Sequence, residues 1–144
     1  PKVFSEHPII GVGLRQVIFH NPYHYVTHNT YLEVLVATGV IGFIPFILII
    51  YLTLKELRTV EKSEGPDNFY LRSYATALEL GFLAYLFAGL FVSVDLNKML
   101  WLTISISAVV FNLYKIQGQA KYGSMKSPRE RNYYNDRILI DINR

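Results

Sequence analysis

The stretch that decides the fold is VLVATGVIGFIPFILIIYLTL, which runs from Val34 to Leu54 without a charged residue. An α-helix rises about 1.5 Å per residue, so this run covers roughly 30 Å, the thickness of the hydrocarbon layer of a bilayer. The stretch therefore predicts a membrane-spanning helix. Pro45 predicts a kink within it, because proline removes a helical hydrogen bond. Gly39 and Gly42 share one face and would permit close contact with another helix.

Two further apolar runs follow, at about residues 73–94 and 99–114. Glu79 interrupts the first of them near its start, which places this carboxylate near the membrane boundary or against a neighbouring helix; a carboxylate inside a membrane is also a functional candidate. The last of these runs, which precedes Lys115, is short for a span. Lys98 and Lys115 flank it and can extend their ammonium groups to the interfaces. The short link between the runs predicts antiparallel neighbouring helices.

The composition agrees with a membrane protein, since 51% of the residues are hydrophobic and 17% are charged. A net charge of +3, not gathered on one face, gives nucleic-acid binding little support. The absence of cysteine excludes disulfides and Cys-ligated metal sites from this chain. We expect an all-α polytopic membrane protein: an outer-face segment at 1–33, three transmembrane helices at about 34–54, 73–94 and 98–114, and a basic, flexible tail at 115–144.

The distribution of lysine and arginine predicts the topology, because these residues collect in cytoplasmic loops. Three spans would place the mixed-charge connection Lys55–Arg72 and the tail on the same side. Four basic residues lie in the connection and seven in the tail, against Lys2, Arg15 and Lys98 on the other side. The connection and the tail are therefore expected in the cytoplasm and residues 1–33 outside. Since the chain begins at Pro1 without a signal-peptide pattern, we expect it to be the C-terminal piece of a longer protein.

The outer segment contains all four histidines, and their spacing permits several interpretations. His20, His24 and His28 recur every fourth residue and would share a helix face suited to a metal, but Pro22 disfavours a helix there. Solvated or hydrogen-bonded histidines are the simpler interpretation. The GVG sequence, Gly11–Gly13, could cradle a phosphate, although a lone GxG is weak evidence and a tight turn is the favoured interpretation.

The sequence segments HPIIGVGL (His7–Leu14) and HNTYLEVLVATGVIGFIPFILII (His28–Ile50) resemble the C-terminal half of the O-antigen ligase and polymerase superfamily. The resemblance covers about the first 50 residues, and two more helices with a basic tail fit the ending of that family. These are multi-pass enzymes of the bacterial inner membrane. They transfer an oligosaccharide or polysaccharide from undecaprenyl diphosphate to a hydroxyl acceptor, such as a lipid A core sugar or a growing glycan, without a cofactor or a metal.

The resemblance implies that His28 is the catalytic residue. An imidazole can accept a proton near neutral pH, and a base assists the attack of a hydroxyl on an anomeric carbon. Arg15 could stabilise the leaving diphosphate, although relatives usually place their key arginines upstream of the HPxxGxG word. Many relatives also carry a glutamate where this chain has Ala37. Asn29 could orient His28 or cap the following helix. We expect contacts to the substrate from Arg15, Asn29, Gly11 and Gly13.

A second hypothesis is a non-enzymatic transporter or envelope-assembly subunit, in which Glu79 and Asp95 serve as coupling or pairing groups. Substitution of Glu79 should then have a larger effect than substitution of His28. The sequence does not distinguish a ligase from a polymerase.

Overall fold

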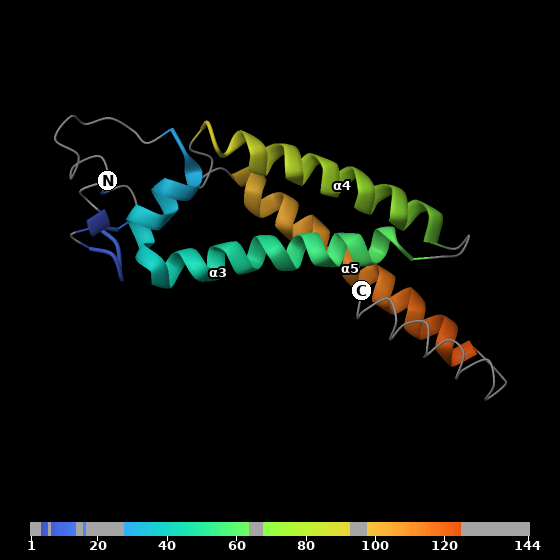
Figure 1. Cartoon of the computed structure of the whole chain (residues 1–144). Coiled ribbons are helices and arrows are strands. Elements are labelled where there is room, and N and C mark those ends of the chain that lie inside the picture. The colour runs from blue at the N-terminus through green and yellow to red at the C-terminus, as the bar shows by residue number, and fades with distance from the viewer. Residues whose placement is uncertain are drawn as a thin grey trace. The chain divides into compact units, whose positions relative to one another are not determined.

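The structure, a computed structural model, describes residues 4, 5, 7–13, 16, 28–63, 68–92 and 98–124. Its elements are the helices α3 (Thr30–Glu61), α4 (Phe69–Ala88) and α5 (Lys98–Ser124), coloured from blue to orange in Figure 1. The described residues form no strand, which confirms the expected all-α class. The tail beyond Ser124 lies outside the described residues.

The helices differ from the predicted spans in their bounds. α3 begins at Thr30 and continues to Glu61, so much of the expected connection is helical. The sequence KELRTVE consists mainly of residues that tolerate a helix, and charge alone does not end one. α5 likewise continues to Ser124, and neither Gly118 nor Gly123 ends it. The prediction that the flexible tail starts at residue 115 was therefore wrong for its first ten residues.

α4 is displaced from the predicted second span, since it begins at Phe69 and ends at Ala88. The residues from Gly89 to Val92 form turns instead. A continuous apolar run does not by itself mark where a helix stops, and here the stop coincides with a buried glycine, Gly89. The short link expected between the second and third spans falls largely on residues 93–97, outside the described residues.

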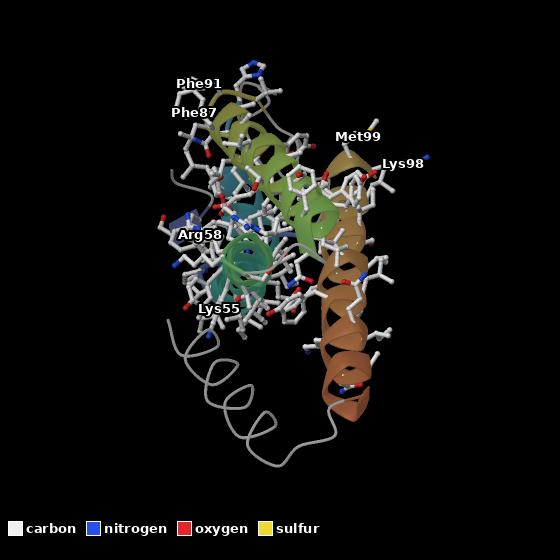
Figure 2. The ribbon with its side chains drawn as sticks, turned by 90° about the vertical axis from the view of Figure 1, so that its right-hand side faces the viewer. Lys55, Arg58, Phe87, Phe91, Lys98 and Met99 are labelled. Atoms are coloured by element: carbon white, nitrogen blue, oxygen red, sulfur yellow. The ribbon has the colours of Figure 1, made fainter. Side chains whose placement is uncertain are left out.

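Among the described residues, two helices are long and apolar enough to cross a membrane: α3 and the Lys98–Ala120 part of α5. Only 28% and 17% of their apolar windows are buried, whereas the core helix of a soluble protein would be mostly buried. Large apolar side chains instead face outward, among them Ile41, Ile44 and Leu48 of α3. Phe87, Phe91 and Met99 also project from the ribbon (Figure 2). Exposed apolar surface on this scale indicates contact with another apolar phase or partner.

The chain separates into two compact units, residues 1–52 with 81–102 and residues 53–80 with 103–144. We refer to them as the first and the second unit. The second unit has a side-chain core that draws on all three helices. Leu57, Val60 and Ala75 are fully buried there and Val110 nearly so, with partly buried residues packed against them: Leu71, Leu78, Phe111 and Tyr114.

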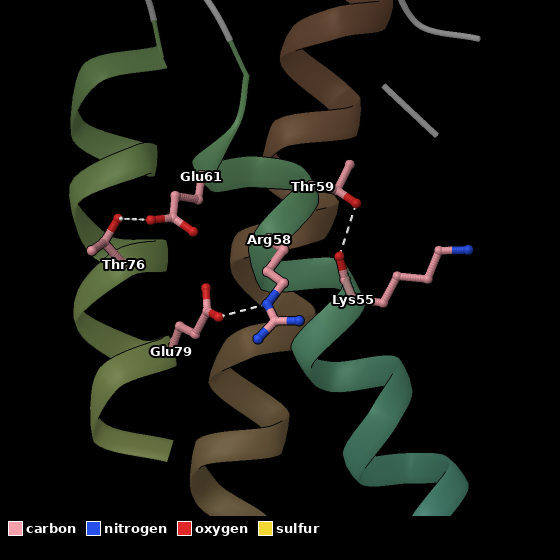
Figure 3. Close-up of polar contacts among 6 residues, drawn as sticks. All are labelled: Lys55, Arg58, Thr59, Glu61, Thr76 and Glu79. Carbon is pink, nitrogen blue, oxygen red and sulfur yellow. Dashed lines mark hydrogen bonds and ion pairs between the residues drawn. The ribbon is translucent and has the colours of Figure 1, made fainter. Parts of the chain in front are cut away.

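Polar contacts in the second unit join α3 to α4 (Figure 3). The Nε of Arg58 donates to Oε1 of Glu79 at 2.8 Å. The hydroxyl of Thr76 lies 3.4 Å from Oε1 of Glu61. The Glu79 side chain is 10% exposed and that of Arg58 is 55% exposed, so the pair combines a buried carboxylate with a guanidinium that reaches solvent. Of the positions predicted for Glu79, contact with a neighbouring helix is confirmed.

Candidate functional site

Within the first unit, α3 is not continuous. Gly39 has φ 64° and ψ −170°, far from helical values, and divides α3 into one piece that ends at Thr38 and another that starts at Val40. Figure 1 shows the ribbon changing direction sharply in this region. The kink expected at Pro45 is thus found at Gly39, whereas Pro45 lies within the second piece. Glycine adopts this left-handed backbone readily because it has no Cβ.

The loop Pro8–Gly13 fills this break with its backbone. The N–H groups of Val12 and Gly13 donate to the carbonyl oxygens of Val36 and Ala37 at 3.0 and 2.8 Å. In the opposite sense, the N–H groups of Val40 and Ile41 donate to the carbonyl oxygens of Pro8 and Ile9 at 3.0 and 3.3 Å. A break in a helix leaves such groups without partners on both of its sides. The loop therefore supplies a partner to two groups on each side of the break.

Two glycines allow this close approach. A Cβ on Gly11 would lie 2.5 Å from the carbonyl carbon and oxygen of Ala37, and a Cβ on Gly39 would collide with the carbonyl group of Ile9. Gly39 thus contacts a loop, so its predicted role in packing two helices was wrong. For Gly42, the nearest atoms to an added Cβ belong to Thr38, on the same helix.

The structure places a turn at Pro8–Ile10, directly before the GVG sequence, and the Gly11 N–H donates to the His7 carbonyl oxygen at 3.1 Å. The next two N–H groups, those of Val12 and Gly13, are bound to α3. No N–H of this glycine turn is left to bind a phosphate, so the hydrogen bonds favour the turn over a phosphate cradle. Contact of Gly11 or Gly13 with the substrate stays a prediction.

Asn29 caps α3, as one of its two predicted roles required. Its Oδ1 accepts the Leu32 N–H at 3.0 Å, the usual geometry of an N-cap side chain. Its Nδ2 donates to the carbonyl oxygen of Leu90 at 3.0 Å. Both polar ends of the amide are therefore engaged in joining the start of α3 to the residues that follow α4.

The two residues after Asn29 continue this junction. Thr30 donates from its N–H to the Gly89 carbonyl and from Oγ1 to the Val92 carbonyl, both at 2.8 Å. The hydroxyl of Tyr31 donates to the Leu86 carbonyl at 2.9 Å. Together with turn hydrogen bonds, these contacts give every carbonyl from Tyr85 to Leu90 a partner. The junction of Asn29, Thr30 and Tyr31 with this segment thus satisfies the orphan acceptors at the end of α4.

His28 lies directly before this junction, and its side chain is exposed. The backbone from residue 29 onward is held by the four hydrogen bonds to the end of α4, so the imidazole projects from a fixed point. No described residue forms a hydrogen bond with it. His7 is also exposed, whereas His20, His24 and the predicted diphosphate ligand Arg15 lie outside the described residues.

Glu33 is a residue to which sequence reasoning gave no role. Its Oε2 is buried and has no hydrogen-bond partner among the described residues. A buried carboxylate oxygen without a partner is costly, so it calls for an explanation such as a bound water, an ion or a ligand. Glu33 lies one turn into α3, five residues after His28. The only sequence signal for Glu33 is its position shortly after the His28–Asn29 pair.

A small apolar hollow lies beside the junction, with a volume of about 200 Å³ that includes open space. Its lining residues come from α3, from α4 with the glycine after it, and from the first turn of α5: Thr30, Tyr31, Phe46, Tyr85, Leu86, Gly89 and Leu100. Tyr31 and Phe46 meet edge to face at 6.5 Å between ring centroids. The lining of the hollow is apolar, and its enclosed space holds little more than one water-sized molecule, which is too small for a sugar. The described residues contain no cluster of His, Asp and Glu able to hold a metal ion.

Comparisons of the chain with known protein families, with curated proteins and with solved structures found no match.

Proposed function

We propose that this chain is part of a bacterial inner-membrane enzyme that transfers a glycan from undecaprenyl diphosphate to a hydroxyl acceptor. The observation that carries the proposal is the junction after His28, which fixes the backbone of Asn29–Tyr31 and leaves the imidazole exposed. A general base has to be accessible to the hydroxyl that it deprotonates, and a fixed backbone restricts where its side chain can lie. The resemblance of the HPIIGVGL and HNTYLEVL words to O-antigen ligases and polymerases supplies the reaction.

In the proposed topology α3, α4 and α5 each cross the membrane, with His28 at its outer surface. The bias of lysine and arginine towards the connection and the tail supports this orientation. Unlike α3 and α5, α4 is not among the described helices that are apolar enough over a long stretch to cross a membrane, and it contains Arg72 and Glu79. The contact of Glu79 with Arg58 neutralises that carboxylate, which reduces the penalty of burying it.

The chemistry follows from the residues. The acceptor hydroxyl attacks the anomeric carbon of the donor sugar, and the bond from that carbon to the diphosphate oxygen breaks. His28 takes the hydroxyl proton, while the diphosphate leaves with the bonding electrons. Arg15 stabilises the negative charge on the leaving group. Glu33 offers its free Oε2 as an acceptor for a sugar hydroxyl. The acceptor itself is a glycan or a lipid A core sugar.

The test is His28→Ala in the full-length protein, with His7→Ala as the matched control on a second exposed histidine. We expect His28→Ala to abolish the transfer product, which is surface glycan on a lipid A core or a growing glycan, at normal protein level, because residues 29–31 still anchor α3. His7→Ala should retain most of the glycan. Unchanged surface glycan in the His28→Ala variant would show that His28 does not take part in the reaction.

A further inference from the structure

One face of α3 in the second unit carries three cations, Lys55, Arg58 and Lys62, which we call the cationic strip. Their spacing of three and then four residues places them on one side of a helix, with about 5–6 Å between neighbouring Cβ atoms. Lys62 directly follows α3, and its N–H donates to the Arg58 carbonyl oxygen at 3.1 Å, so it continues the helical path. All three residues are exposed. The proposed function assigns no ligand to this strip.

Among the described residues, the strip is largely without counter-charge. Arg58 binds Oε1 of Glu79 through its Nε alone, which leaves the N–H groups of both Nη atoms for another acceptor. The ammonium groups of Lys55 and Lys62 form no hydrogen bond or ion pair in this part of the chain. Figure 3 shows the Lys55 side chain extended away from α4. The strip therefore retains positive charge that an external anion could neutralise.

The other carboxylates on this part of α3 do not supply that anion. Glu61 is turned towards α4, where its Oε1 lies 3.4 Å from the hydroxyl of Thr76 (Figure 3). Glu56 follows Lys55 directly, and consecutive residues of a helix do not face each other.

The strip lies where the proposed span of α3 would leave the hydrocarbon. The uncharged run ends at Leu54, and Lys55 is the next residue. Arg58 and Lys62 follow Leu54 by four and eight residues, which is roughly 6 and 12 Å along the helix. The headgroup layer on each side of a bilayer is about 5–8 Å thick. The strip thus begins at the level of the phospholipid phosphates and extends to the outer edge of that layer.

The chemistry of the strip matches a phosphate. A guanidinium can donate two parallel hydrogen bonds to phosphate oxygens, and lysine adds a point charge on a flexible stem. We propose that the cationic strip binds the phosphate of an anionic phospholipid of the cytoplasmic leaflet, such as phosphatidylglycerol. A zwitterionic lipid fits less well because its headgroup carries its own cation. This inference rests on the membrane topology of the proposed function.

The experiment measures, by native mass spectrometry, how the delipidated full-length protein binds phosphatidylglycerol and phosphatidylcholine with the same acyl chains. The main variant combines Lys55→Gln with Lys62→Gln, which removes no contact between described side chains and leaves Arg58 bound to Glu79. Arg58→Lys keeps the charge but removes the planar pair of donors. Lys62→Gln alone is matched with Lys115→Gln, which removes the same charge from α5.

We expect the wild type to bind phosphatidylglycerol several-fold more tightly than phosphatidylcholine. The double variant should lose this preference, Lys62→Gln and Arg58→Lys should weaken it, and Lys115→Gln should retain it. An equal preference in the wild type and the double variant would overturn the proposal. Equal losses in Lys62→Gln and Lys115→Gln would also overturn it, because net charge rather than the strip would then set the preference.

Two further arms separate the sources of the phosphate and the two proposals. Inorganic phosphate that displaces phosphatidylglycerol at an equal concentration would show that the strip binds a free anion, which contradicts a lipid site. Binding is measured without a glycan donor or acceptor. Unchanged surface glycan in His28→Ala would therefore overturn the proposed enzyme and leave the lipid preference standing. Loss of glycan in His28→Ala, beside a wild type without lipid preference, would overturn the lipid site alone.

Discussion

The two units of this chain are held together by different means. The second unit depends on side chains: Leu57, Val60 and Ala75 are fully buried, and Arg58 pairs with Glu79. In the first unit, backbone hydrogen bonds join the loop to the break at Gly39. The start of α3 is joined to the residues at the end of α4 by the side chains of Asn29, Thr30 and Tyr31 and by the Thr30 N–H. The candidate catalytic residue His28 belongs to the first unit. Its position therefore depends on the hydrogen bonds made by the side chains of Asn29, Thr30 and Tyr31.

The comparison teaches where each unit is vulnerable. A side-chain core loses stability in proportion to the volume removed from it. A joint made of backbone groups tolerates side-chain changes around it but not an added Cβ at the point of contact. We therefore expect the second unit to be destabilised by the removal of atoms from its core. We expect the first unit to be destabilised by the addition of a single methyl group where the loop contacts α3.

The largest effect is expected from Gly39→Ala. The new Cβ would collide with the Ile9 carbonyl and would hold a left-handed backbone, which alone costs roughly 1–3 kcal/mol. Displacement of the loop would remove up to four hydrogen bonds of about 1 kcal/mol each. We expect a large drop in the midpoint of thermal unfolding in detergent micelles, with loss of glycan transfer.

Gly81→Ala is the matched control, because no atom lies within 4 Å of a Cβ added to Gly81 in α4. Alanine is favoured over glycine in a helix by about 1 kcal/mol, so this variant should be as stable as the wild type or more stable. Equal losses in the two variants would show that the first unit does not depend on contact at Gly39.

Leu57→Ala should have the next largest effect. Leu57 is fully buried in the core of the second unit, and truncation of such a side chain costs about 2–5 kcal/mol. Leu113→Ala, at a position that is 46% exposed on α5, provides the control and should lower the unfolding midpoint much less. Similar midpoints for the two variants would argue against a side-chain core in this unit.

The smallest effect is expected from Glu79→Gln. The Arg58 side chain is 55% exposed, so the loss of charge from its partner should cost no more than about 1 kcal/mol, and glutamine retains an acceptor oxygen. Glycan transfer should persist in this variant while His28→Ala abolishes it. The reverse order of effects, measured on surface glycan at equal protein level, would support a transporter or assembly subunit instead.

The sequence predicted the helical class, the three helices and the cap formed by Asn29 because these depend on local pattern. It did not predict the break at Gly39, for which Pro45 was the more obvious candidate. The break is stabilised by hydrogen bonds from a loop 26 to 31 residues earlier in the chain, and these have no local signature. For the same reason, the contacts of Thr30 and Tyr31 with the end of α4 could not be inferred. The ends of the helices were missed where charged residues or glycines continue a helix.

Hydrogen–deuterium exchange of the full-length protein in lipid nanodiscs tests the joint at the break most directly. If the loop backbone is bound to α3, the amides of Val12 and Gly13 exchange slowly in the wild type. In Gly11→Ala, the added Cβ would collide with Ala37, so the amides of Val12 and Gly13 should exchange fast. The exchange rates of the amides of Leu57–Val60 should stay unchanged. Fast exchange of Val12 and Gly13 in the wild type, at the rates of an unstructured peptide, would contradict the backbone joint and the fixed position of the loop.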